Sequence, residues 1–120
     1  MIDDLDAAAE LFRRALDAAE ARKDPAEAVR FAVLLANAHV DKGDFTAAEA
    51  LLERTMTLAP DANDPVLRAR VYWSQSRLHS MQNNSREAAR YARKALELLE
   101  LTENTHYTAR AHQLLAHIEL

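Results

Sequence analysis

Small and apolar residues recur along this chain at a spacing of 40 residues. The coinciding positions include Ala8, Ala48 and Ala88; Ala15, Thr55 and Ala95; Leu16, Met56 and Leu96; and Val29, Ala69 and Ala109. Within each repeat the apolar residues fall three or four positions apart, as they do on one face of an α-helix. Self-similarity at a period of about 20–50 residues is typical of a solenoid built from stacked helical units. The pattern therefore predicts helical hairpins packed side by side.

Residues that favour helix starts recur with the same period. They are Asp4, Asp44 and Asn84 and, half a repeat away, Asp24, Asp64 and Asn104. Asp and Asn side chains accept hydrogen bonds from the free amides of a first helical turn, so we expect one helix to begin near each of them. Glu27 and Glu87 lie three residues after a cap, which predicts two capping boxes.

The expected helices cover about 5–22, 24–42, 44–59, 64–82, 85–101 and 104–120. Gly43 and Asn83 are the expected left-handed helix terminators. Pro60 is expected to end the third helix, because proline lacks the amide that a helix needs. The predicted fold is all-α: one domain of antiparallel helical hairpins in a right-handed superhelix of about six helices, with repeat units of roughly 4–22, 24–60, 64–101 and 104–120.

Composition agrees with this fold class and excludes several functions. The chain has 120 residues, 49% of them hydrophobic, with one Gly and three Pro, which leaves little material for β-turns. There is no Cys, and hence no disulfide and no thiolate metal site. A formal net charge of -4 does not suit direct contact with nucleic acid. No apolar run approaches the length of about 20 residues that a membrane span needs, so we expect a cytoplasmic protein without a membrane partner.

Nearly the whole chain is similar to the tetratricopeptide repeat family. Ala36, Gly43–Phe45, Ala48, Leu52 and Leu58–Pro60 resemble the family's order of small, turn, aromatic, large and proline positions. A weaker second copy is formed by Ser76, Asn84, Ala88, Ala95 and Leu98. The resemblance implies a non-enzymatic domain that binds a protein or peptide.

A narrower resemblance covers residues 68–120. Arg70–Ser74, Arg90–Leu96 and Ala109–Ala116 look like the repeat half of helix-turn-helix transcriptional regulators of bacteria, actinobacteria in particular. In that family a DNA-binding domain precedes the repeats, which sense an effector or mediate self-association. The resemblance implies that this chain is the effector or self-association part of such a regulator. The alternative is a free-standing adaptor that binds an acidic peptide segment.

The phase of the repeat predicts unpaired helices at both ends. Counted from the turn at Gly43, the chain opens with the second helix of one hairpin and closes with the first helix of another. Leu114, Leu115 and Ile118 would leave the last helix with an apolar face, although terminal repeats usually carry a polar one. We therefore expect a piece of a longer chain, or a homodimer formed through the terminal helices. The alternative is that the last helix is itself a modified cap.

The first helices of such hairpins line the concave face, and their outward positions predict a binding groove. Arg30, Arg70 and Arg110 are equivalent by repeat, and Trp73 lies one turn beyond Arg70. Arginine and tryptophan are frequent binding hot spots, and arginine holds carboxylates through paired hydrogen bonds. The candidate partner-binding residues are Arg30, Asn37, Arg70, Trp73, Arg77, Arg110, Gln113 and His117.

Two alternatives to this groove stay open. The arginines could pair only with acids of neighbouring helices, and Trp73 could be a packing residue. The chaperone-binding members of the resembled family use a clamp of five polar residues on two carboxylates. Asn37 and Arg110 match that clamp, whereas Val33, Ser74 and Leu114 do not, so a complete clamp is not expected.

Nothing in the sequence indicates catalysis, a metal site or a cofactor. His39 and His79 are equivalent by repeat, which favours packing positions. His112 and His117 are five residues apart, a spacing that does not bring two ligands to one helix face as a spacing of four does. The sequence also has no glycine-rich phosphate loop and no nucleophile motif.

Overall fold

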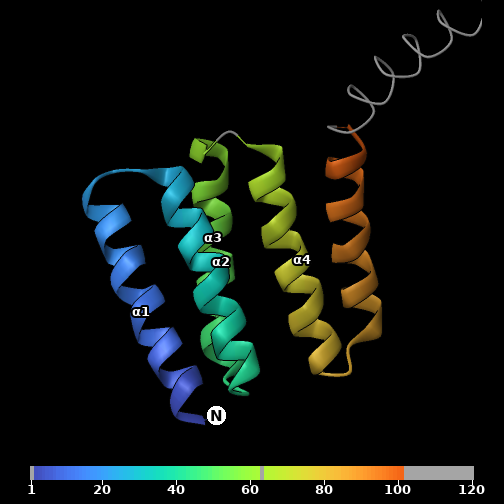
Figure 1. Cartoon of the computed structure of the whole chain (residues 1–120). Coiled ribbons are helices and arrows are strands. Elements are labelled where there is room, and N and C mark those ends of the chain that lie inside the picture. The colour runs from blue at the N-terminus through green and yellow to red at the C-terminus, as the bar shows by residue number, and fades with distance from the viewer. Residues whose placement is uncertain (1, 63, 102–120) are drawn as a thin grey trace, which may run out of the picture.

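The structure, a computed structural model, describes residues 2–62 and 64–101, and these contain helices and no strand. The helices are α1 (Ile2–Ala21), α2 (Pro25–Asp41), α3 (Phe45–Ala62), α4 (Pro65–Met81) and a fifth helix over 85–101. The chain reverses direction at each turn, so successive helices are antiparallel (Figure 1). The all-α class of antiparallel hairpins is thus confirmed. The described part has five helices rather than six, since the helix expected from Asn104 lies outside the described residues.

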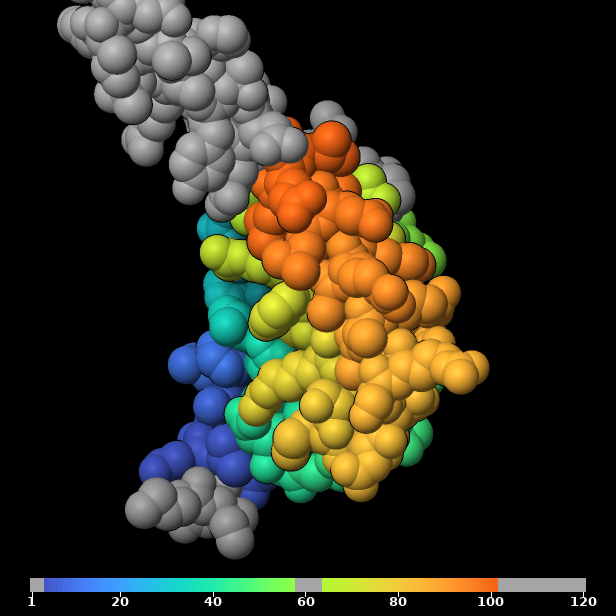
Figure 2. Space-filling view, turned by 90° about the vertical axis from the view of Figure 1, so that its right-hand side faces the viewer, coloured from blue at the N-terminus to red at the C-terminus, as the bar shows by residue number. Residues whose placement is uncertain are grey.

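Helix α2 is the centre of the packing. It lies against α1, α3 and α4, and α4 in turn lies against both α2 and α3. One buried cluster joins α2, α3 and α4, and includes Val29, Leu52 and Val71. A second cluster joins α1 to α2 through Leu16 and Leu35. Burial of each such side chain contributes about 1.5–3 kcal/mol, so the stack is held mainly by apolar contact. Helix 85–101 forms one end of the described stack (Figures 1 and 2).

The three tight turns share one backbone arrangement. Lys23, Gly43 and Asn83 have φ angles of 56°, 82° and 61°. At the Gly43 turn the amide of Gly43 donates to Val40 O at 3.0 Å and the amide of Asp44 donates to His39 O at 2.8 Å. The other two turns repeat this pair of bonds, which is the Schellman ending of a helix. Gly43 and Asn83 were expected in this role, whereas the sequence pattern does not predict a left-handed lysine.

The capping side chains of Asp24, Asp44 and Asp64 are confirmed, but the reciprocal half of the predicted capping boxes is not. Asp24 Oδ1 accepts from the amide of Glu27 at 3.2 Å. The amide of Asp24 itself already donates to Ala19 O at 3.0 Å, which leaves Glu27 nothing to bond there. Glu27 pairs with Arg30 instead, at 2.9 Å. Glu87 likewise pairs with Arg90, because the amide of Asn84 is used by the preceding helix.

Two predicted helix boundaries are wrong. Helix α1 begins at Ile2, so Asp4 lies inside the first turn and does not cap it. Helix α3 runs through Pro60 to Ala62. Pro60 removes the backbone hydrogen bond that its own amide would make, but the residues after it keep their amides, so the helix continues past this position.

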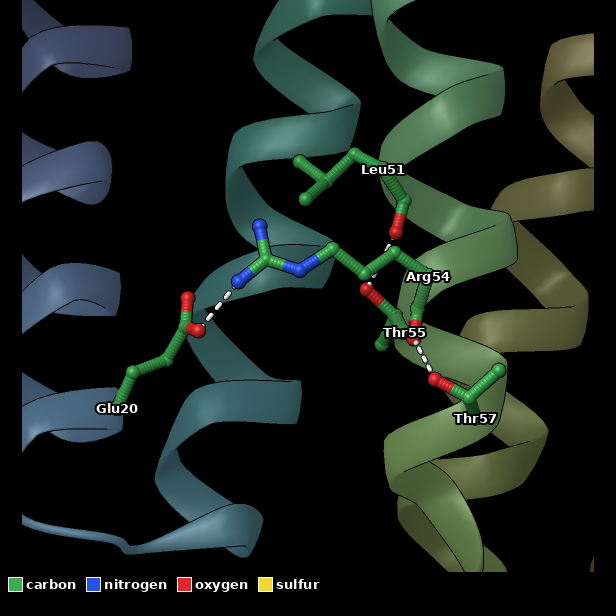
Figure 3. Close-up of polar contacts among 5 residues, drawn as sticks. All are labelled: Glu20, Leu51, Arg54, Thr55 and Thr57. Carbon is green, nitrogen blue, oxygen red and sulfur yellow. Dashed lines mark hydrogen bonds and ion pairs between the residues drawn. The ribbon is translucent and has the colours of Figure 1, made fainter.

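Polar contacts join α1 to α3 and satisfy the buried hydroxyl of α3. Arg54 of α3 forms an ion pair with Glu20 of α1 across the gap between the helices (Figure 3). Thr55 is buried, and its hydroxyl donates to Leu51 O at 2.6 Å, so no polar group is left without a partner there. Thr57 makes the same kind of bond to Arg54 O. Because the Arg54 and Glu20 side chains are partly exposed, this ion pair adds little to stability.

Helix 85–101 is attached to α4 by an aromatic stack and one hydrogen bond. Tyr91 lies between Tyr72 and His79, with ring centroids 6.2 Å and 5.4 Å away. The Ser76 hydroxyl donates to Ala88 O at 2.7 Å, which requires a close approach of the two helices. Small residues at 76 and 88 permit that approach.

His39 is half-buried on α2, and its Nδ1 is buried without a hydrogen-bond partner among the described residues. Burial lowers its pKa from the ordinary value of 6.5. Asp44 opposes this shift, while Lys42 and Arg13 add to it. The folded chain therefore resists protonation of a group that the unfolded chain protonates readily.

The left-handed turns predict opposite effects of two substitutions. Gly43→Ala lowers the free energy of unfolding by about 1 kcal/mol, because alanine meets the backbone cost of a positive φ. No atom lies within 4 Å of the position of the added methyl group, so packing contributes nothing to that cost. Lys23→Gly raises the free energy of unfolding, but by less than about 1 kcal/mol. Glycine removes the backbone cost of the positive φ, and this gain is partly offset because glycine makes the unfolded chain more flexible. Urea unfolding of the three proteins measures both effects, and a Gly43→Ala protein as stable as wild type contradicts the argument.

The lowered pKa of His39 predicts a loss of stability in mild acid. As the pH falls through 6.5, the unfolded state binds a proton that the folded state refuses, so the free energy of unfolding decreases. We expect His39→Gln to lose less stability than wild type between about pH 7.5 and about pH 5.5. Urea midpoints of both proteins at the two pH values measure the difference, in which the shared carboxylates cancel. The same decrease in both proteins rules out a role for His39.

Candidate functional site

A hollow of about 480 Å³ lies between α2, α4 and helix 85–101. In Figure 2 helix 85–101 (orange) faces the viewer, and α4 (yellow) lies between it and α2 (teal) toward the left. The lining residues are Val33, Leu34 and Asn37 of α2; Val66, Ala69, Arg70, Trp73 and Ser74 of α4; and Ala95, Leu96 and Leu99 of helix 85–101. Most of these side chains are apolar, so the hollow suits an apolar group with a few polar contacts.

The predicted stripe on α4 splits into an inward and an outward part. Ser74 is buried, and its hydroxyl donates to Asn37 Oδ1 at 2.7 Å, which ties α4 to α2. Arg70 and Trp73 stay exposed on the wall of the hollow. The amide nitrogen of Asn37 donates no hydrogen bond to the described residues and is available to a ligand. Asn37, Arg70 and Trp73 therefore line the same hollow, and their role in binding a partner stays a prediction.

The three predicted arginines on α2 and α4 have different surroundings. Arg30 is paired with Glu27, and Arg77 is paired with Asp41 of α2; neither lines the hollow. Arg70 forms no ion pair within the described residues. The difference between Arg30 and Arg70 is visible in the sequence. Glu27 lies three residues before Arg30, whereas Leu67, which cannot form an ion pair, lies three residues before Arg70. The alternative that the arginines only pair with acids thus holds for two of the three described ones.

Three apolar side chains are unusually exposed at this hollow. Trp73 is 55% exposed, Leu96 47% and Leu34 39%. Large apolar residues that share one concave surface commonly mark a binding site. Trp73 has the largest exposed fraction of the three.

Other predicted residues lie elsewhere, and some lining residues were missed. Arg110, Gln113 and His117 lie outside the described residues. Leu96 and Leu99 form the third wall, although only the first helices of hairpins were expected to line a groove. Their contribution arises because the hollow extends over the side of α4 that faces helix 85–101, which depends on how these two helices pack. The only available sequence signal was the apolar character of positions 95, 96 and 99 on one face of that helix.

The described residues hold no group of three or more His, Asp or Glu placed to share a metal ion. Among the helices that the structure describes, none combines the length and the apolar character needed to cross a membrane. The site is therefore characterised by its apolar lining, one cation and one amide.

Comparison with known protein families identifies the repeat that forms these helices. The tetratricopeptide repeat family matches residues 27–101, which span α2 to the end of the fifth helix. Comparison with curated proteins and with solved structures gave no significant match. The matched segment contains the hairpin of α2 and α3, the hairpin of α4 and helix 85–101, and every residue that lines the hollow. The chain belongs to the tetratricopeptide repeat family, whose helical hairpins serve protein–protein interaction.

Proposed function

We propose that this chain binds a peptide segment of a partner protein along the α2–α4 side of the hollow, with a carboxylate of the peptide held by Arg70. The observation that carries the proposal is an arginine without an acidic partner in the described structure, at the rim of an apolar hollow. The chain as a whole is acidic, with a net charge of -4, so a cation left in this way favours an acidic ligand locally.

The hollow supplies the other contacts that a peptide needs. Val33 and Leu34 of α2 offer an apolar wall, and burial of one leucine-sized side chain there contributes about 1.5–3 kcal/mol. The free amide nitrogen of Asn37 suits a backbone carbonyl oxygen of the peptide. Apolar anchoring with one cation and one amide donor fits a short segment with an apolar residue beside an acidic residue or a carboxyl terminus.

A peptide selection tests this proposal. Panning a random peptide library against the chain should enrich sequences that combine an apolar residue with an acidic residue or a free carboxyl terminus. Arg70→Ala should weaken binding of a selected peptide by more than about 1 kcal/mol, or about fivefold in Kd. Calorimetric titration gives the affinities.

The matched control is Arg86→Ala, an exposed arginine of helix 85–101 that does not line the hollow. It should leave the affinity within error of wild type. An equal loss of affinity in the two variants would mean that only the net charge of the chain matters. No loss of affinity in Arg70→Ala would mean that the peptide binds elsewhere.

We further propose that this binding serves a bacterial helix-turn-helix transcriptional regulator in the cytoplasm, as its effector-sensing or self-association part. The resemblance of residues 68–120 to the repeat half of such regulators supports it. The second candidate is a free-standing adaptor that uses the same hollow. It is supported by Arg70, which has no acidic partner among the described residues. That the chain has no catalytic activity and no cofactor stays a prediction under either proposal.

The size of the natural protein separates the two candidates. An antibody raised against this chain should detect, in its own cells, a protein much larger than 13.5 kDa if the regulator proposal is right. The larger band should also bind DNA through its additional part. A band at 13.5 kDa contradicts the regulator proposal and leaves the adaptor.

A further inference from the structure

A second hollow lies on the other side of α2 from the first. It has a volume of about 230 Å³ and lies between α1, α2 and α3. On α2 it is lined by Leu35 and His39. The first hollow is lined on α2 by Leu34 and Asn37, among others. Successive residues of a helix are separated by about 100° around its axis, which places these two pairs on roughly opposite faces of α2. The two sites are therefore separate.

The next repeat shows what fits beside the histidine of such a hollow. His79 is the counterpart of His39, and the Nδ1 atom of each is buried without a hydrogen-bond partner among the described residues. The ring of Tyr91 lies on the ring of His79, with centroids 5.4 Å apart and planes 5° apart. Arg90 and Lys94 lie over the same tyrosine ring, 5.0 Å and 5.5 Å from its centroid. This part of the repeat thus accepts an aromatic ring flanked by cations.

The earlier repeat has the same surroundings but a smaller residue in place of the tyrosine. Leu51 stands at the position of Tyr91, and Arg54 stands at the position of Lys94. Both line the second hollow together with His39. Figure 3 shows Leu51 and Arg54 extending from α3 toward α1. The hollow therefore includes space that an aromatic ring fills one repeat later.

Two opposite charges on α1 add polar contacts to this hollow. Arg13 and Asp17 both line it, and neither side chain forms an ion pair with a described residue. Burial lowers the pKa of His39 and the charge of Arg13 adds to this effect, so Arg13 lies near the histidine ring. Side chains four residues apart on a helix are neighbours, with about 5–6 Å between their Cβ atoms. One small molecule that carries both a carboxylate and an ammonium group can therefore contact both side chains.

We propose that this second hollow binds a free aromatic amino acid. The ring lies on His39, over the apolar side chains of Leu16 and Leu35. The carboxylate contacts Arg13 and the ammonium group contacts Asp17. The volume is below the about 300–1,000 Å³ of pockets for drug-sized ligands, so it suits one ring with a short polar end. The two opposite charges favour a free amino acid over an aromatic residue inside a peptide, whose amino and carboxyl groups form amide bonds.

Titration of the full chain with L-phenylalanine, followed by amide chemical shifts in NMR spectra, tests the proposal. A ligand of this size should bind with a Kd on the order of 1 mM. We expect saturable shifts at His39 and Leu51 and none at Trp73, which lines the first hollow. The absence of saturable shifts overturns the proposal, and so do saturable shifts confined to the first hollow.

Two control compounds separate the parts of the ligand. L-Leucine lacks the ring, and N-acetyl-phenylalanine amide lacks both charges. Each should bind at least about fivefold more weakly than L-phenylalanine. Equal binding of L-leucine overturns the role of the ring. Equal binding of the blocked compound also overturns the proposal, because the hollow would then accept an aromatic residue of a peptide.

A pair of variants with matched charge tests the carboxylate contact. Arg13→Gln removes the proposed partner and should weaken binding of L-phenylalanine at least about fivefold. Arg14→Gln removes the same charge at the next position, where the side chain pairs with Glu10 and does not line the hollow. It should leave the Kd unchanged. Equal Kd values in the two variants overturn the assignment of Arg13.

Leu51→Tyr tests the comparison between the repeats. It supplies the ring that Tyr91 supplies one repeat later, and should abolish binding of L-phenylalanine while the circular dichroism stays that of wild type. A folded Leu51→Tyr protein with the wild-type Kd overturns the placement of the ring. Leu51 packs against both buried clusters, so if this variant does not fold, the comparison of Arg13→Gln with Arg14→Gln decides. Since no peptide is present, failure here is distinct from failure of peptide binding.

Discussion

The stacking of these helices depends on turns in which one residue serves two helices at once. The amide of Asp24 closes the helix behind it by donating to Ala19, while its carboxylate opens the helix ahead by accepting from Glu27. Asp44 has the same double role between α2 and α3. A turn built in this way has no spare residue, so the two helices must lie side by side and antiparallel. The preceding left-handed residue is what allows the reversal.

This arrangement decides which polar predictions succeed. Asp and Asn at helix starts could be identified from the sequence, because N-capping depends on residue type and on position within the repeat. The return bonds from Glu27 and Glu87 could not be excluded from the sequence, since whether the cap amide is free depends on the helix before it. Lys23 was missed for a related reason: its φ is imposed by the shared turn, and lysine has no preference for that conformation. Pro60 is the opposite case. A proline predicts the end of a helix, but the loss of one backbone hydrogen bond does not end α3 here.

The sequence predicts the parts of the candidate site that follow from the repeat, but not the parts that depend on particular neighbouring side chains. Asn37, Arg70 and Trp73 could be placed together, because equivalent positions on α2 and α4 face the same side. That Arg30 and Arg77 are neutralised depends on particular acids, one three residues away and one on the neighbouring helix. The wall formed by Leu96 and Leu99 depends on the packing of helix 85–101 against α4, which the stack of Tyr72, Tyr91 and His79 helps to set.

The partly buried hydrogen bond between Ser74 and Asn37 has a consequence for recognition. By donating to the amide oxygen, the serine hydroxyl fixes the orientation of the asparagine side chain, so that its nitrogen is the atom offered to the hollow. The side chain is ordered before any ligand arrives, and the entropy cost of ordering it has already been met during folding. The surface between α2 and α4 is therefore pre-organised to prefer oxygen acceptors over hydrogen-bond donors, a selectivity set by the interior of the stack.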